Sequence, residues 1–266
     1  MELLSALQKV EERGALETAD RALMLARQVW NYWLPTAEIQ QRNITEGLKK
    51  RLTPYRGKTF AAIVEPKRFG ELLRAMRTYK GGPIVRTALQ LAPLLYQRPG
   101  NLRMMEWAEL DLDEALWTIP SMKMKRTKEE KENGEAHIVP LPAQAVALLR
   151  NIQTLTGHGT YVFHGERSHD RPISDNSVRS ALYALGFGKE QSWHGFRASA
   201  RTMIVDELNL DPLAIEANLA HAVKDSNGRS YNRTQYLKQR AELLQKWADY
   251  VDKLARGADV IALKAA

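Results

Sequence analysis

The sequence predicts a mainly α-helical protein with one small β-hairpin or sheet, divided into two domains. Most apolar residues recur every three or four positions, which is the spacing of helices that bury one face. The runs 116–120 and 137–141 are rich in β-branched residues and read as short strands. Between residues 53 and 68, proline, glycine and mixed charges interrupt the helical pattern and indicate a connection between domains.

Residues 1–55 are expected to form a small helical domain. One helix places Leu7 and Val10 on the same face and ends at Gly14. A second helix ends at Pro35, because proline cannot donate a backbone hydrogen bond. This segment is almost neutral, with 8 Lys and Arg residues against 7 Asp and Glu residues.

Residues 56–65 are predicted to be a linker, and residues 66–266 a larger, mostly helical domain. Its helices are expected at 66–76, 83–95, 142–155, 174–186, 193–208, 211–220 and 232–255. The two strand-like runs are expected to pair as a hairpin, whose long charged loop contains an Asn133-Gly134 turn.

Composition narrows the class of protein. The chain has 266 residues, a formal net charge of +8 and no cysteine. Most of the excess positive charge lies after residue 55, and it favours a polyanionic partner. The absence of cysteine excludes disulfides, thiolate zinc sites and cysteine nucleophiles, and fits a reducing cytoplasm. No apolar run approaches the ~20 residues of a membrane helix, and the N-terminus is not a secretory signal.

Six polar residues stand at the predicted junctions between elements, and they carry the candidate chemistry. They are Arg98, Lys123, His194, Arg197, His221 and Tyr231. Together these residue types, in this order, resemble the active site of the tyrosine recombinases, the phage integrase family. The surrounding segments agree as well, including "LLYQRPGNLRMMEWAELDLDEALWTIP", "HIVPLPAQAVALL" and "WHGFRASARTMI". The resemblance covers about residues 83–254, with a weaker helical match across residues 1–55.

The resemblance implies a tyrosine recombinase catalytic fold, preceded by a helical, SAM-like core-binding domain. It implies integration and excision of a mobile element, by metal-independent DNA cleavage through a 3′-phosphotyrosine intermediate and religation. The likeness is greatest to integrases of satellite phages and genomic islands, which carry a further N-terminal arm-binding domain. This chain is expected to lack that domain, because its match begins at or inside the core-binding domain.

Arginine and histidine suit the stabilisation of a phosphate under attack. The planar guanidinium binds two phosphate oxygens at once and stays charged at working pH. Arg98 and Arg197 are therefore expected to hold the nonbridging oxygens. His194 is expected to accept the tyrosine proton or to hold the phosphate, and His221 to donate a hydrogen bond to a phosphate oxygen.

The nucleophile and the acid leave alternatives open. The spacing from the last histidine favours Tyr231 as the nucleophile over Tyr236. Lys123 is expected to protonate the leaving 5′-oxygen, with Lys125 as its rival. Because a lysine has an ordinary pKa of about 10.4, we expect neighbouring cations to lower the pKa of the catalytic one.

Other basic residues are expected to contact DNA phosphates, which makes binding sensitive to salt. They are Lys49, Lys50, Arg51, Lys125, Arg126 and Lys128. The expected partners are double-stranded DNA attachment sites and accessory DNA-bending or excision factors. The free protein is expected to be a monomer that forms a homotetramer on DNA. No metal, cofactor or membrane is expected, and the expected location is the cytoplasm, at the bacterial nucleoid.

Asn101 departs from the family pattern, which has an acidic residue three positions after the first arginine. An amide can orient a neighbouring group but cannot balance its charge. Two other functions share parts of the pattern, namely a non-catalytic repressor derived from an integrase and a type IB topoisomerase. The presence of all six residue types argues against the repressor, and the helical first domain favours the recombinase.

Overall fold

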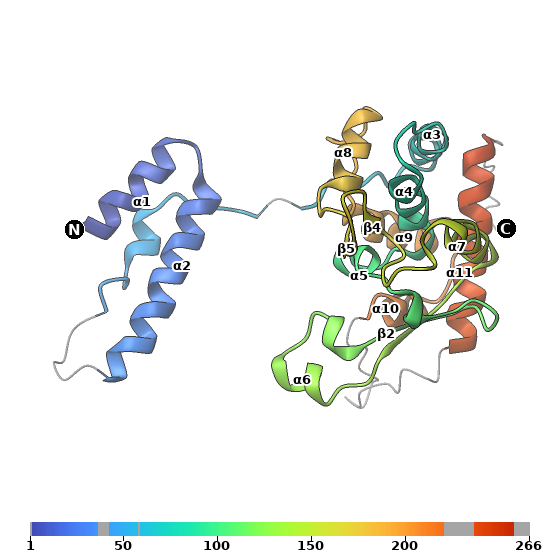
Figure 1. Ribbon diagram of the computed structural model, residues 1–266. Coiled ribbons are helices and arrows are strands. Elements are labelled where there is room, and N and C mark those ends of the chain that lie inside the picture. The colour runs from blue at the N-terminus through green and yellow to red at the C-terminus, as the bar shows by residue number, and fades with distance from the viewer. Residues whose placement is uncertain (1, 37–42, 58, 221–236, 258–266) are drawn as a thin grey trace. The chain divides into compact units, whose positions relative to one another are not determined.

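The computed structural model describes residues 2–36, 43–57, 59–220 and 237–257. The chain divides into two compact units, Met1–Thr59 and Phe60–Ala266. Both units are mainly helical (Figure 1). No helix among the described residues is both long enough and apolar enough to span a membrane.

The first unit is built on two helices that pack against each other. Its elements are α1 (Glu2–Glu12), α2 (Leu16–Trp33) and the short 3-10 helices η1 (Leu34–Thr36) and η2 (Leu48–Arg51). Leu7 of α1, Leu23 of α2 and Leu52 after η2 form its buried cluster. The Tyr55 hydroxyl donates to Glu17 Oε2 at 2.9 Å, which ties the chain after η2 to α2.

The second unit combines helices with two small antiparallel sheets (Figure 1). Its helices are α3 (Pro66–Arg77), α4 (Pro83–Leu95), α5 (Pro99–Arg103), α6 (Lys128–Glu132), α7 (Ala143–Thr156), α8 (Ser177–Ala184), α9 (Gly195–Asp206), α10 (Pro212–Asn218) and α11 (Leu237–Arg256), with 3-10 helices η3 (Trp107–Glu109) and η4 (Ser121–Lys123). Its strands are β1 (Leu110–Asp111), β2 (Leu116–Ile119) and β3 (His137–Pro140) in one sheet, and β4 (His164–Gly165) and β5 (Ser168–Pro172) in the other. The predicted fold class, mainly α with a small sheet, is confirmed.

Helix α4 forms much of the core of the second unit. Leu89, Leu91 and Leu95 are fully buried along it, as expected of a helix that is apolar on most sides. Trp247 of α11 is also fully buried and donates its indole N–H to Pro93 O at 2.8 Å. This carbonyl lies in the last turn of α4, where backbone oxygens lack partners within the helix. The bond therefore fixes α11 against the end of α4, close to Arg98.

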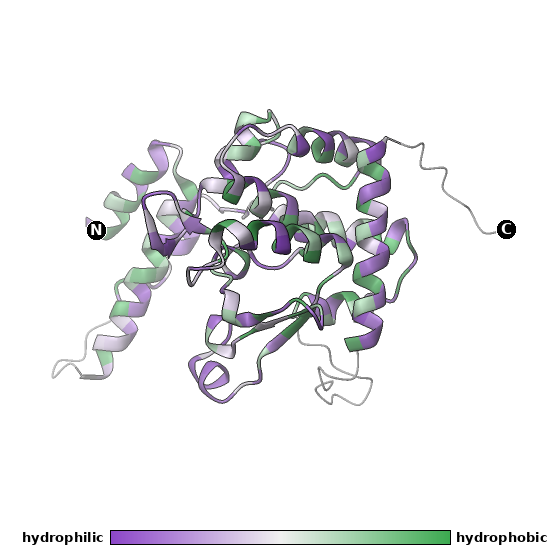
Figure 2. Cartoon of the chain, turned by 45° about the vertical axis from the view of Figure 1, so that its right-hand side comes forward, coloured by the Kyte–Doolittle hydropathy of each residue, from purple (hydrophilic) through white to green (hydrophobic). Residues whose placement is uncertain are grey.

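The predicted hairpin is present, and its loop contains more helical structure than the sequence suggested. Strands β2 and β3 pair antiparallel, with Trp117 opposite Val139. The charged loop between them contains η4 and α6. Thr127 is the N-cap of α6 and forms a capping box with Glu130. It is hydrophilic along its whole length (Figure 2), so this helix is stabilised by its cap and by solvent rather than by burial.

Candidate active site

Arg98 lies at the N-cap of α5, directly after a sharp turn. Tyr96 ends α4 in the left-handed region at φ 37°, so the chain reverses before Pro99 starts α5. The Arg98 guanidinium is partly buried, and burial lowers its pKa. Within the described part of the chain it donates no hydrogen bond and forms no ion pair. A partly buried cation without a counter-ion is costly, and is typical of a site that binds an anion.

Arg197 is placed beside Arg98 by two backbone carbonyls. It lies in the first turn of α9 and is only 6% exposed. Its Nη1 donates to Tyr96 O at 3.2 Å and its Nη2 donates to Leu219 O at 2.9 Å. Burial, followed by the charge of Arg98, lowers the pKa of Arg197 to about 10. The two arginines that the sequence predicts as a phosphate clamp therefore lie within electrostatic reach of each other.

His194 joins this cluster from the N-cap of α9. Its ring lies on Phe60, with centroids 4.3 Å apart. Burial lowers the pKa of His194, and the charges of Arg197, Arg98 and Lys125 lower it further. The imidazole is therefore neutral near pH 7, which suits a proton acceptor.

Gly195 explains how the segment "WHGFRAS" holds this histidine. A side-chain carbon at Gly195 would lie 2.0 Å from the carbonyl oxygen of Ala61. The same oxygen accepts hydrogen bonds from Ser192 N at 2.9 Å and Ser192 Oγ at 3.0 Å. The chain at residue 61 is thereby fixed against the turn before α9, and only glycine fits at that contact.

The expectation that cations lower the pKa of Lys123 is wrong in this structure. Lys123 Nζ donates to Met104 O at 3.0 Å, to Glu106 Oε1 at 2.6 Å and to Glu109 Oε1. Burial lowers the pKa of Lys123, but the hydrogen bonds to Glu106 and Glu109 outweigh this effect and leave the pKa raised. The physical reason is that Glu106 at the N-cap of η3 is half-buried and Glu109 within η3 is buried, so both carboxylates need a counter-ion.

Lys125 is the lysine whose charge reaches the candidate site. It is exposed and contributes to the lowered pKa of His194. Its neighbour Met124 is 2% exposed, and Met124 Sδ accepts a weak hydrogen bond from Asn101 Nδ2 at 3.3 Å. Because Asn101 lies on α5, this contact fixes the hairpin loop next to the helix that begins at Arg98. Asn101, the departure from the family pattern, thus orients the loop that carries both lysines.

Two of the predicted residues, His221 and Tyr231, lie outside the described residues, and so does the alternative nucleophile Tyr236. The description stops after Ala220, shortly beyond α10, and resumes at Leu237, where α11 begins. Both flanks of this segment belong to the second unit, as do Arg98, His194 and Arg197.

The basic residues predicted to contact DNA differ in their surroundings. Most of them are exposed, namely Lys49, Lys50, Arg51, Lys125 and Lys128. Arg126 is half-buried instead. It donates to Ser121 Oγ at 2.9 Å and to Glu135 O at 2.7 Å, so it holds the hairpin loop together.

The sequence did not indicate the buried polar residues at the end of α10, which lies next to Arg197. Arg240 of α11 is 1% exposed, and Asn218 at the end of α10 is fully buried. A signal for Arg240 was present in the sequence. It continues the apolar stripe of Leu237, Leu244 and Trp247 at helical spacing, where a charged residue is unusual.

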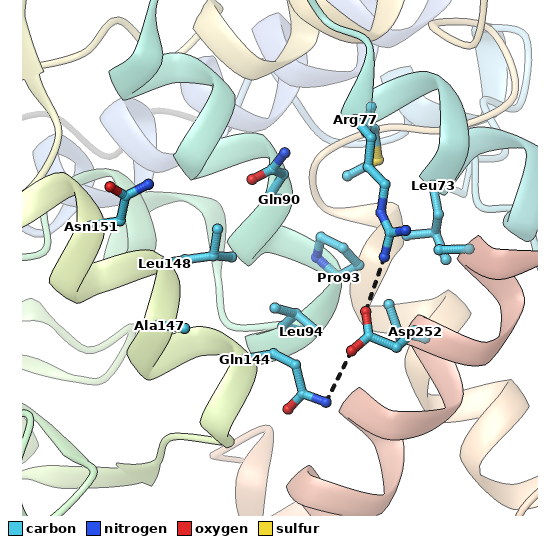
Figure 3. Close-up of a pocket in the computed structure, with 13 residues that line it drawn as sticks. Leu73, Arg77, Gln90, Pro93, Leu94, Gln144, Ala147, Leu148, Asn151 and Asp252 are labelled. Carbon is cyan, nitrogen blue, oxygen red and sulfur yellow. Dashed lines mark hydrogen bonds and ion pairs between the residues drawn. The ribbon is translucent and has the colours of Figure 1, made fainter.

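A separate pocket of about 420 Å³ opens between α3, α4, α7 and α11 (Figure 3). Its charged lining residues, Arg77 and Asp252, pair with each other at 3.0 Å, and Gln144 donates to Asp252 Oδ2 at 3.2 Å. The charges cancel, so this pocket does not suit a phosphate. The described residues also contain no group of three or more His, Asp or Glu side chains placed to hold a metal ion.

Comparisons with known proteins agree with this arrangement. The sequence pattern of the phage integrase family matches residues 63–238. The integrase of Enterobacteria phage P4 is 30% identical over 258 residues, covering 94% of this chain and 58% of that protein. A putative protein, IntB, of Escherichia coli K12 is 30% identical over 259 residues, covering 94% of this chain and 65% of that protein. The chain thus spans about six-tenths of the length of these curated relatives.

Two solved structures share the fold. A lambda integrase tetramer bound to a Holliday junction superposes with a TM-score of 0.59 at 15% identity, covering 87% of this chain and 66% of that one. A lambda integrase dimer bound to a COC′ core site gives a TM-score of 0.57 at 15% identity, covering 87% and 65%. The fold is that of the tyrosine recombinases. The chain belongs to the phage integrase family.

Proposed function

We propose that this protein is a site-specific tyrosine recombinase that integrates or excises a mobile DNA element. One observation carries the proposal. The partly buried Arg98, with no counter-ion among the described residues, lies close enough to Arg197 and His194 for its charge to lower the pKa of both. Such a concentration of positive charge suits the transition state of an attack on a DNA phosphate.

The reaction follows from the chemistry of these groups. Tyr231 Oη attacks phosphorus, so a bond from phosphorus to Oη forms while the bond to the 5′-oxygen breaks. Arg98 and Arg197 neutralise the nonbridging oxygens, and His221 donates a further hydrogen bond. Neutral His194 accepts the tyrosine proton. Religation is the reverse: a 5′-hydroxyl attacks the phosphotyrosine, and Tyr231 leaves.

The leaving 5′-oxygen must gain a proton, and we assign its donor to Lys125. The ammonium of Lys123 is held by Glu106 and Glu109, whereas the charge of Lys125 acts on His194. Lys123 is the alternative donor, and it would have to leave both carboxylates to reach the phosphate.

We further propose that the first unit is a core-binding domain and that the two units bind duplex attachment sites together. Lambda integrase, which shares the fold, has been crystallised as a dimer on a core site and as a tetramer on a Holliday junction. By analogy, four copies of this chain exchange strands on DNA, with free monomers as the starting form. Accessory DNA-bending or excision factors and a cytoplasmic, nucleoid location complete the proposal.

A covalent adduct tests the function directly. The protein is incubated in EDTA with a nicked core-site duplex, from which the released strand diffuses away. We expect a protein–DNA adduct that survives denaturation, because the chemistry uses no metal. Tyr231→Phe should bind this DNA and form no adduct, while Tyr236→Phe should still form it. Loss of the adduct only in Tyr236→Phe would move the nucleophile to Tyr236.

The same experiment separates the rival functions. Tight DNA binding by the unmodified protein, with no adduct on any duplex, would favour a repressor. Adduct formation together with relaxation of any supercoiled DNA, without exchange between two sites, would favour a topoisomerase.

The pH dependence of cleavage is a further expected result. Because the pKa of His194 is lowered from its ordinary value of about 6.5, the imidazole is neutral above that pH and becomes charged only below it. Cleavage at subsaturating DNA, which reports the free protein, should therefore fall as pH drops below about 6.5. In His194→Gln the rate should be low and should lack this acidic limb. An acidic limb that survives in His194→Gln would assign the proton acceptor to another group.

A further inference from the structure

Phe60 is an exposed aromatic residue whose ring lies on a candidate catalytic side chain. It is 63% exposed, and its ring centroid lies 4.3 Å from that of His194, with 37° between the two ring planes. A single apolar side chain at the surface is ordinary and needs no explanation. The position of this one does, because two aromatic rings in contact attract each other by more than the area that they bury.

The segment that carries this ring is fixed to the turn that presents His194. Ala61 O accepts hydrogen bonds from Ser192 N at 2.9 Å and from Ser192 Oγ at 3.0 Å. Ile63 N donates to Gln191 Oε1 at 2.7 Å, and the Gln191 side chain is 1% exposed. These bonds lie two and three residues before the histidine. The aromatic ring that precedes Ala61 is therefore held over the same turn from which the imidazole extends.

The imidazole of His194 forms no hydrogen bond with any residue that the structure describes. A catalytic base is commonly oriented by a hydrogen bond to a third group, and the outer torsion of a histidine side chain is soft without one. The charges of Arg98 and Arg197 lower the pKa of His194, but repulsion of this kind does not fix the plane of its ring. The contact with Phe60 supplies the orientation that a hydrogen bond supplies in other sites.

We propose that Phe60 is a positioning residue for the reaction: its ring lies on the imidazole of His194 and holds that imidazole at the phosphate site of Arg98 and Arg197. The proposal rests on the proposed function. It predicts that loss of the ring leaves the imidazole free to rotate and slows the chemical step. DNA binding persists, because both arginines keep their places.

Phe60→Ala removes the ring and leaves the backbone bonds of residues 61 and 63 in place. We expect cleavage of saturating core-site DNA in a single turnover to be about tenfold slower, because an aromatic pair contributes about the free energy that a tenfold change in rate requires. The Kd for that DNA should change by no more than about twofold, since the phosphate-binding arginines are unchanged. The thermal midpoint should also change little, because the side chain is mostly exposed.

Two other substitutions of Phe60 and one nearby variant serve as controls. Phe60→Tyr keeps the ring and should cleave at the normal rate. Phe60→Leu keeps the apolar bulk without a planar ring and should be nearly as slow as Phe60→Ala. Val64→Ala shortens another exposed apolar side chain of the same segment, 45% exposed, and should cleave at the normal rate. Slow cleavage by Phe60→Tyr would overturn the proposal, since the ring would then not be the feature that matters.

The double variant of Phe60→Ala with His194→Gln tests whether the ring acts through the histidine. It should be no slower than His194→Gln alone, because both substitutions remove the same contribution. A further loss of about tenfold in the double variant would mean that the ring acts on another group, and the proposal would fail.

Nuclear magnetic resonance of the free protein tests the contact without any reaction. The imidazole protons of His194 should change their chemical shift in Phe60→Ala, because the ring current of the neighbouring phenyl group is lost. They should keep it in Val64→Ala. Equal spectra for His194 in both variants would show that the ring does not lie on the imidazole, and would overturn the proposal.

The outcomes separate this proposal from the function on which it rests. No adduct with the unmodified protein refutes the recombinase function, and any catalytic role of Phe60 with it, even where the spectra show the ring contact. A normal adduct, with Phe60→Ala cleaving as fast as Val64→Ala, refutes only the role of Phe60. A loss of DNA affinity in parallel with the rate would also refute this role, because Phe60 would then be a DNA contact.

Discussion

Arg98→Ala should slow DNA cleavage by about a thousandfold or more and leave the protein as stable as before, or more stable. Removing a preorganised group that stabilises transition-state charge costs roughly 10²–10³ in rate, and a phosphate-binding arginine up to about 10⁵. Arg98 has no other partner in the described residues, so this loss falls on the bound phosphate.

The sign of the stability change follows from electrostatics. Burial lowers the pKa of Arg98, which means that the folded protein disfavours its charge. The charge of Arg98 also lowers the pKa of Arg197, so the two guanidiniums repel each other. Alanine at position 98 removes both costs. A functional site that is strained in this way gains stability when its function is removed.

Arg103→Ala is the matched control on the same helix. Arg103 forms an ion pair with Asp175 at 2.7 Å and donates to Ile173 O at 3.1 Å, so its charge is already used within the protein. This variant should keep most of its cleavage rate and lose some thermal stability. Single-turnover cleavage and the thermal midpoint measure both properties. Equal rates for the two variants would remove Arg98 from the phosphate site.

The helices and the hairpin could be predicted because each is encoded locally. The spacing of apolar residues and the prolines at positions 66 and 83 place α3 and α4 within a residue of their observed starts. The β-branched runs place β2 and β3 in the same way.

The surroundings of the site residues could not be predicted, since they depend on contacts between distant segments. The pairing of Lys123 with Glu106 and Glu109 spans 14 to 17 residues, and that of Arg240 with Asn218 spans 22. The spacing of residues along the chain does not indicate such contacts between distant segments. The sequence therefore predicted which residue types form the site. It could not predict which of the two lysines, Lys123 or Lys125, is already paired with carboxylates.

The second large effect is expected for the lysine that protonates the leaving 5′-oxygen. Lys125→Ala should slow cleavage of ordinary DNA by about 10²–10⁴, the usual contribution of a general acid. A duplex with sulfur in place of the 5′-oxygen at the cleavage site leaves as a thiolate. A thiol has a pKa near 8.5, so its departure needs no proton. On that duplex, Lys125→Ala should cleave nearly as fast as the unmodified protein.

Lys123→Ala should behave differently, because Lys123 neutralises the half-buried Glu106 and the buried Glu109. Its raised pKa means that the charged form stabilises the fold at neutral pH, and that this contribution is lost only as pH rises through the raised value. The variant should therefore melt at a lower temperature and be slowed to the same extent on both duplexes. The opposite result would be that the sulfur-containing duplex restores the cleavage rate of Lys123→Ala and not that of Lys125→Ala. It would show that Lys123 leaves Glu106 and Glu109 when DNA binds and is itself the acid. The ion pair would then be a resting state that DNA must break.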